Sequence, residues 1–143
     1  MRLHQQTFWL MAAQFVWGAT VSGTVINAWV LSQREQGDPD GRAIFMAIMV
    51  VLGVTFGFFS YRVSLRVLRG PRRPLTNPHL HYFGTTLLAM FLADFIHVFG
   101  LVCGFYNTPF LLVLLTFFVP MWLLFAMSVP TRAKITRWTT SGA

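Results

Sequence analysis

The sequence has very few charged residues and almost no acids. Lysine, arginine, aspartate and glutamate make up 10% of the 143 residues, and only four of them are acidic. Soluble domains contain about 25% charged residues, so this composition excludes an ordinary soluble domain. Hydrophobic residues account for 55% of the chain. The length fits one domain, and we expect that domain to be all-α and embedded in a membrane.

Cysteine and catalytic motifs are also scarce. Cys103 is the one cysteine, so the chain cannot form an intramolecular disulfide. The sequence contains no Ser-x-x-Lys motif, no glycine-rich phosphate loop and no His-Glu-x-x-His motif, each of which marks a common enzyme class. No group of histidines, cysteines and acids has the spacing of metal ligands. We therefore expect no enzymatic activity, no metal and no cofactor.

The basic residues give a net charge of +7, which could indicate nucleic-acid binding. They flank apolar segments and form no face of their own, so we exclude nucleic acid and interpret them as topology determinants. Anionic lipid headgroups are their natural partners. The expected contacts for such headgroups, or for a partner protein, are Arg66, Arg69, Arg72 and Arg73.

Four apolar runs are each long enough to cross a bilayer as a helix, which requires about 20 residues. They lie near residues 7–31, 43–65, 80–104 and 109–129. The short connections predict a single antiparallel bundle of four transmembrane helices. Nine basic residues lie on the side of both termini and the middle loop, against two on the other side. The positive-inside rule therefore predicts cytoplasmic termini, and we expect a protein of the bacterial inner membrane.

Asp94 is the one acid inside a long apolar run, since Glu35, Asp38 and Asp40 share a short polar loop. It lies about 15 Å from the end of its span at a rise of 1.5 Å per residue. That depth is near the middle of a hydrocarbon core about 30 Å thick. An ionisable residue there is costly and marks a functional site by default. His97, one turn later, is the second candidate.

Hydroxyl groups at similar depth on the other spans predict a polar layer around Asp94. The expected members are Thr20, Thr24, Thr55 and Thr116. Thr20 and Thr24 share a polar side of the first span with Asn27, and Pro120 cannot donate to the Thr116 carbonyl, so the fourth helix should kink there. Burial favours the neutral acid, which either donates a structural hydrogen bond or exchanges a proton if water reaches it.

Glycine pairs predict close helix packing in the second and third spans. Gly53 and Gly57, like Gly100 and Gly104, have Gly-x-x-x-Gly spacing, which lets helix backbones approach closely in lipid. Gly100 and Gly104 lie on the same side of the third span as His97, and Asp94 lies at the edge of that side. We therefore expect both candidate side chains to face protein rather than lipid.

Histidines are candidate haem ligands, and a membrane haem needs axial ligands from facing helices. His79, His81 and His97 all belong to the third span or its entrance, and His4 lies near the N-terminus. Two ligands from one helix cannot hold a haem from both faces. A haem within the chain is therefore not expected, although His4, His81 or His97 could complete a site in a partner.

The segment over residues 72–102 begins with Arg72-Arg-Pro74 and ends with Asp94-Phe-Ile-His-Val-Phe-Gly-Leu-Val102. It resembles the second half of ATP synthase proteolipid (c) subunits, and small uncharacterised four-span bacterial membrane proteins look similar in the same region. The resemblance implies that Asp94 is an ion-carrying carboxylate. The chain departs from that family because its acid lies in the third of four spans and the partner helix is not glycine-rich.

Three functions follow from these features. The first is a non-enzymatic accessory, structural or assembly subunit that packs against itself or a partner membrane protein through its small-residue seams. The second is a proton or cation translocating element that uses Asp94. The third is a redox-associated subunit that completes a quinone or haem site of a partner.

Overall fold

The computed structural model describes residues 2–33, 43–71, 75–106 and 108–140. These residues form helices and contain no strand, which confirms the predicted all-α class. The elements in chain order are α1 (Arg2–Ser32), α2 (Ala43–Arg69), α3 (Pro78–Phe105), α4 (Phe110–Val113), η1 (Leu114–Phe118), α5 (Val119–Ser128) and α6 (Arg132–Thr140).

Four helical stretches are long and apolar enough to cross a membrane, which confirms the predicted number of spans. They cover His4–Ser32, Ile44–Arg69, Pro78–Phe105 and Phe110–Ser128. The last stretch combines α4, η1 and α5. These features are those of an integral membrane protein.

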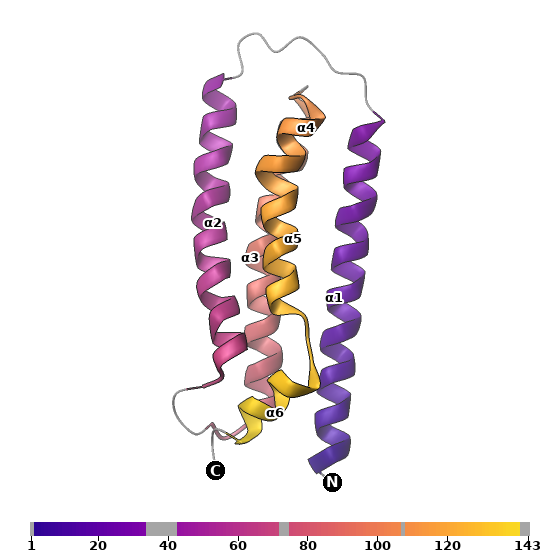
Figure 1. The fold of residues 1–143 in the computed structure, drawn as a ribbon, viewed down its shortest axis with the longest axis vertical. Helices are drawn as coiled ribbons and strands as arrows, with labels where there is room; N and C mark the ends of the chain where they lie inside the picture. The colour runs from indigo at the N-terminus through magenta and orange to yellow at the C-terminus, as the bar shows by residue number, and fades with distance from the viewer. Residues whose placement is uncertain (1, 34–42, 72–74, 107, 141–143) are drawn as a thin grey trace.

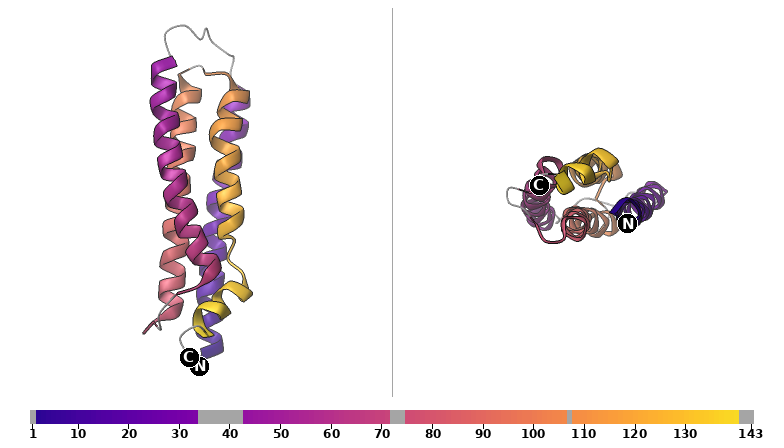
Figure 2. Two further views of the ribbon diagram at one scale, coloured as in Figure 1. Left: turned by 60° about the vertical axis from the view of Figure 1, so that its left-hand side comes forward. Right: turned by 90° about the horizontal axis from the view of Figure 1, so that it is seen from below.

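The helices form an elongated bundle in which α1 and α2 lie on opposite sides (Figure 1). Between them lie α3 and the continuous α4–η1–α5 helix, as the view from below also shows (Figure 2). The N- and C-termini lie at the same end of the bundle. Most of the hydrophobic core comes from α3 and the η1–α5 region, where Phe117, Phe118 and Met121 are fully buried.

The predicted packing glycines all lie where neighbouring helices approach closely. A Cβ atom added at Gly100 would lie 2.8 Å from the Cβ of Phe117, and one at Gly104 would lie 2.8 Å from a methyl group of Leu31. At Gly53 and Gly57 the nearest atoms would be 3.2 and 3.5 Å away. The seam of small residues on α3 therefore brings α1 and η1 against this helix.

The fourth span adapts to Pro120 with a π-helical turn. The N–H of Val119 donates to the carbonyl of Leu114, five residues earlier, at the end of η1. A single π turn inside an α-helix widens the backbone locally. This π-helical turn lies just before Pro120, and the kink expected at the proline stays a prediction.

The C-terminal tail forms α6, which the sequence did not predict as a helix. Its apolar side chains Ile135 and Trp138 are buried in a second hydrophobic cluster with Leu10, Val67 and Tyr82. Ile135 and Trp138 are three residues apart, so they lie on the same side of the helix. The tail is therefore packed against the end of the bundle where both termini lie.

Helix α6 also binds the ends of α2 and α5 through their backbone carbonyls. Trp138 donates from Nε1 to the carbonyl of Val67 at 3.1 Å, and Arg137 donates to that of Leu68. The Lys134 ammonium donates to the carbonyls of Met127 and Val129 at 2.8 and 2.7 Å. The last carbonyls of a helix have no partner within it, and cations are stabilised there.

Candidate functional site

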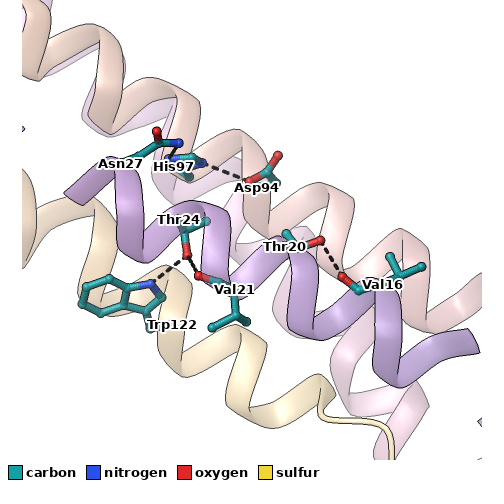
Figure 3. A network of polar contacts seen from close by, with 8 residues as sticks. All are labelled: Val16, Thr20, Val21, Thr24, Asn27, Asp94, His97 and Trp122. Carbon is teal, nitrogen blue, oxygen red and sulfur yellow. Dashed lines mark hydrogen bonds and ion pairs between the residues drawn. The ribbon is translucent and has the colours of Figure 1, made fainter. Parts of the chain in front are cut away.

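A chain of three polar side chains connects α1 with α3 inside the membrane-spanning region (Figure 3). Asn27 Nδ2 lies 3.1 Å from His97 Nε2, and His97 Nδ1 lies 3.1 Å from Asp94 Oδ1. Asn27 comes from α1, while Asp94 and His97 are one turn apart on α3. Asp94 and His97, the two predicted functional residues, are thus in direct contact. Asn27 was not among the predicted site residues, although it lies on the polar side of the first span.

The two ring nitrogens of His97 determine which protonation states this arrangement can accommodate. With the Asn27 amide as donor, Nε2 is an acceptor and Nδ1–H donates to an ionised Asp94. The group then carries one negative charge. If the Asn27 amide turned by 180°, its oxygen would accept a hydrogen bond from Nε2–H of His97. This second arrangement fits a charged His97 imidazolium beside ionised Asp94. It also fits a neutral His97 imidazole beside protonated Asp94. Both of these states have no net charge.

Asp94 does not face the interior of the bundle as expected. His97 is 7% exposed, but 42% of the Asp94 side chain is accessible from outside the protein. Ala93 is buried on the packed side of α3, and each following residue turns by about 100°. Asp94 therefore points to the flank of α3, with one carboxylate oxygen held by His97.

The predicted polar layer does not form around Asp94. Among the described residues, its polar contact is with His97, and none of the four threonines bonds to it. Thr20 donates to the carbonyl of Val16 and Thr55 to that of Val51, each four residues earlier. Threonine hydroxyl groups in helices commonly donate to such a carbonyl of their own helix. Thr116 lines a groove between α2 and α5.

Thr24 instead forms a cross-link between α1 and α5. It is 1% exposed, accepts a hydrogen bond from Trp122 Nε1 at 3.1 Å and donates to the carbonyl of Val21 at 2.8 Å. Trp17 makes a parallel link from α1, donating to the carbonyl of Phe125 at 2.9 Å. The indole N–H groups of both tryptophans join neighbouring helices.

The remaining candidate residues do not join this site. Arg66 and Arg69 are exposed at the end of α2, whereas Arg72 and Arg73 lie outside the described residues. His4 and His81 are exposed. Within residues 2–33, 43–71, 75–106 and 108–140, no three histidine, cysteine or acidic side chains are placed to hold a metal ion.

No protein-family model, curated protein or solved structure matches the chain. The resemblance of residues 72–102 to proteolipid subunits is therefore without independent support.

The role of Thr24 can be tested with a matched pair of substitutions. We expect Thr24→Val to destabilise the protein by about 1 kcal/mol, because it removes the acceptor of a buried indole N–H. Thr20→Val should have little effect, since that hydroxyl bonds only within its own helix. Thermal unfolding of the detergent-solubilised protein measures both. Equal melting temperatures for the two variants would show that the Trp122 contact contributes nothing.

Proposed function

We propose that this chain is an accessory subunit of a membrane protein complex and that the α1–α3 flank around Asp94 contacts a partner helix. The observation that carries this proposal is the 42% exposure of the Asp94 side chain within a membrane span. A carboxyl group open to lipid at mid-membrane depth is unfavourable. A partner helix that covers it removes that cost.

The chemistry of the partner follows from what Asp94 lacks. His97 binds one carboxylate oxygen, and the basic residues of the described spans lie at the end of α2, beginning at Arg62. A partner that presents a lysine, an arginine or another strong donor at the depth of Asp94 would complete its hydrogen bonds. A second copy of this chain has no basic residue at that depth in its described spans, so we favour a different protein.

The proposed orientation has antiparallel spans and both termini in the cytoplasm of a bacterial cell. The excess of basic residues on the side of the termini and the middle loop, nine against two, supports it. The position of both termini at one end of the bundle also supports it (Figure 1). The partner would then meet Asp94 in the middle of the inner membrane.

The test compares Asp94→Asn and Asp94→Leu in mildly solubilised native membranes. Asparagine keeps the size and hydrogen-bonding ability of aspartate, whereas leucine keeps neither polar atom. We expect the wild-type chain to co-migrate with a partner. This association should be weaker for Asp94→Asn and lost for Asp94→Leu. Thr55→Leu is the control, because Thr55 is exposed at similar depth on α2.

Native mass measurement of the complexes identifies what is bound. A complex that survives Asp94→Leu would contradict a contact at this residue. A species made of this chain alone would show that the partner is a second copy, contrary to the chemistry proposed above.

Proton or cation exchange at Asp94 is the second candidate, and the contact with His97 supports it. The Asn27–His97–Asp94 group can take up one proton while keeping both hydrogen bonds, provided that the amide turns. In this case Asp94→Asn would abolish function while leaving the complex intact. A redox role has less support, because both ring nitrogens of His97 already have partners.

A further inference from the structure

A surface groove runs between α2 and the η1–α5 helix, and Ile96 of α3 also belongs to its lining. Its volume is about 370 Å³, and its lining is almost entirely apolar. Val54 and Leu123, which line it, are 67% and 62% exposed, so the groove opens to the surroundings of the bundle. Gly53 and Gly57 form part of its α2 side together with Val54. In a membrane this surface meets hydrocarbon.

The length and depth of the groove match one leaflet of a bilayer. It extends along α2 from Val50 to Tyr61 and along the facing helix from Thr116 to Met127. Each stretch covers about 16 Å at a rise of 1.5 Å per residue. Arg62 follows Tyr61 directly and marks the polar boundary of α2. The groove therefore reaches from the headgroup region to about the middle of a core about 30 Å thick.

One cation lies at the headgroup end of the groove, and a second lies beyond it. Lys134 donates to the carbonyl of Met127, which lines the groove, and Arg137 donates to that of Leu68, two turns beyond Tyr61. The α5 wall of the groove thus ends at Lys134, and Arg137 lies further along α2, beyond the end of the other wall. The Lys134 ammonium has three N–H bonds, and two of them are used by the carbonyls of Met127 and Val129.

Burial makes this cation receptive to a nearby anion. It lowers the pKa of the Lys134 ammonium, because removal from water disfavours the charged form. A phosphate group at the remaining N–H would offset this effect and keep the lysine charged. The last carbonyls of α2 and α5 already attract the cations to this place.

We propose that the groove binds one phospholipid with an anionic headgroup, with one of its acyl chains along Gly57 and its phosphate at Lys134. The site lies on the termini side of the membrane and is separate from the Asp94 surface. Apolar lining alone would accept any hydrocarbon chain. Lys134 at its end, with Arg137 beyond, selects for a headgroup with net negative charge.

The test uses native mass spectrometry of the full-length protein with defined lipids. At equal concentrations we expect phosphatidylglycerol to remain bound and phosphatidylcholine to dissociate. Gly57→Leu and Val54→Phe fill the groove from two positions and should each abolish retention of phosphatidylglycerol. Gly84→Leu is the control, because nothing lies within 4 Å of a Cβ atom at this exposed glycine of α3.

The headgroup contact is tested separately. Lys134→Gln should weaken phosphatidylglycerol binding about fivefold, as expected for one basic residue near an anionic headgroup, and Lys134→Arg should restore it. Arg62→Gln is the charge control, since Arg62 lies over the ring of Phe58 outside the groove lining. Equal retention of both lipids, or unchanged binding in both filled variants, would overturn the proposal. Displacement of the lipid by inorganic phosphate at similar concentration would also overturn it, because the groove would then contribute nothing.

Discussion

Gly100→Ala is expected to destabilise the bundle by about 1–3 kcal/mol, the usual cost of overpacking a well-filled core. The new Cβ would lie 2.8 Å from the Cβ of Phe117 and 3.2 Å from the ring of Phe118. The Cβ of Phe117 cannot move without its backbone, so α3 and η1 would have to separate. Thermal unfolding in detergent, with the fraction of monodisperse protein, measures the loss.

Gly84→Ala is the matched control for this prediction. Gly84 belongs to the same helix, yet nothing lies within 4 Å of a Cβ atom placed on it. Alanine also has a higher helix propensity than glycine, so this variant should be as stable as wild type or more stable. If both variants unfolded at the same temperature, close packing at Gly100 would not be a determinant of the bundle.

The spans and the packing glycines could be predicted because they depend on local features of the sequence. A run of about 20 apolar residues is long enough to cross a bilayer whatever its neighbours are. Gly100 and Gly104 lack side chains in any fold. A close approach of another helix at their positions could therefore be predicted without knowing which helix it is. Their contacts with Phe117 and Leu31, in contrast, required the three-dimensional structure.

The surroundings of Asp94 could not be predicted in the same way. Its exposure depends on which side of α3 meets α1, and this is set by packing of the whole bundle. The polar layer predicted from the threonines does not form for a related reason. Equal depth in the membrane brings side chains together only if they also face each other, and Thr20 and Thr55 bond to their own helices instead.

Helix α6 was missed because its composition is dominated by polar and basic residues, which are typical of an interfacial tail. Ile135 and Trp138 were the available signal, since their spacing of three residues places both on one side of a helix. The burial of that side depends on Leu10, Val67 and Tyr82, which come from three other helices. Such a contact appears only when the bundle is assembled.

Trp138→Ala is expected to have the largest effect of any substitution outside the spans. Trp138 is 5% exposed, packs edge-on against Tyr82 at 5.9 Å between ring centroids and donates to the carbonyl of Val67. Removal of a buried tryptophan side chain typically costs about 3–5 kcal/mol. Because α6 has nine residues, it is too short to be stable alone. We expect it to detach and unfold.

Limited proteolysis of residues 132–140 distinguishes detachment of α6 from unfolding of the whole bundle. Trp138→Ala should be cleaved there rapidly while the spans stay intact, and Trp138→Phe should be intermediate, because it keeps an aromatic ring but leaves the Val67 carbonyl without its donor. Trp29→Ala is the control, since Trp29 is 65% exposed on α1.

Detachment would also carry Lys134 and Arg137 away from the α2–α5 groove, so Trp138→Ala should lose phosphatidylglycerol binding together with protease resistance. Protease resistance equal to that of wild type would contradict the role assigned to the tryptophan.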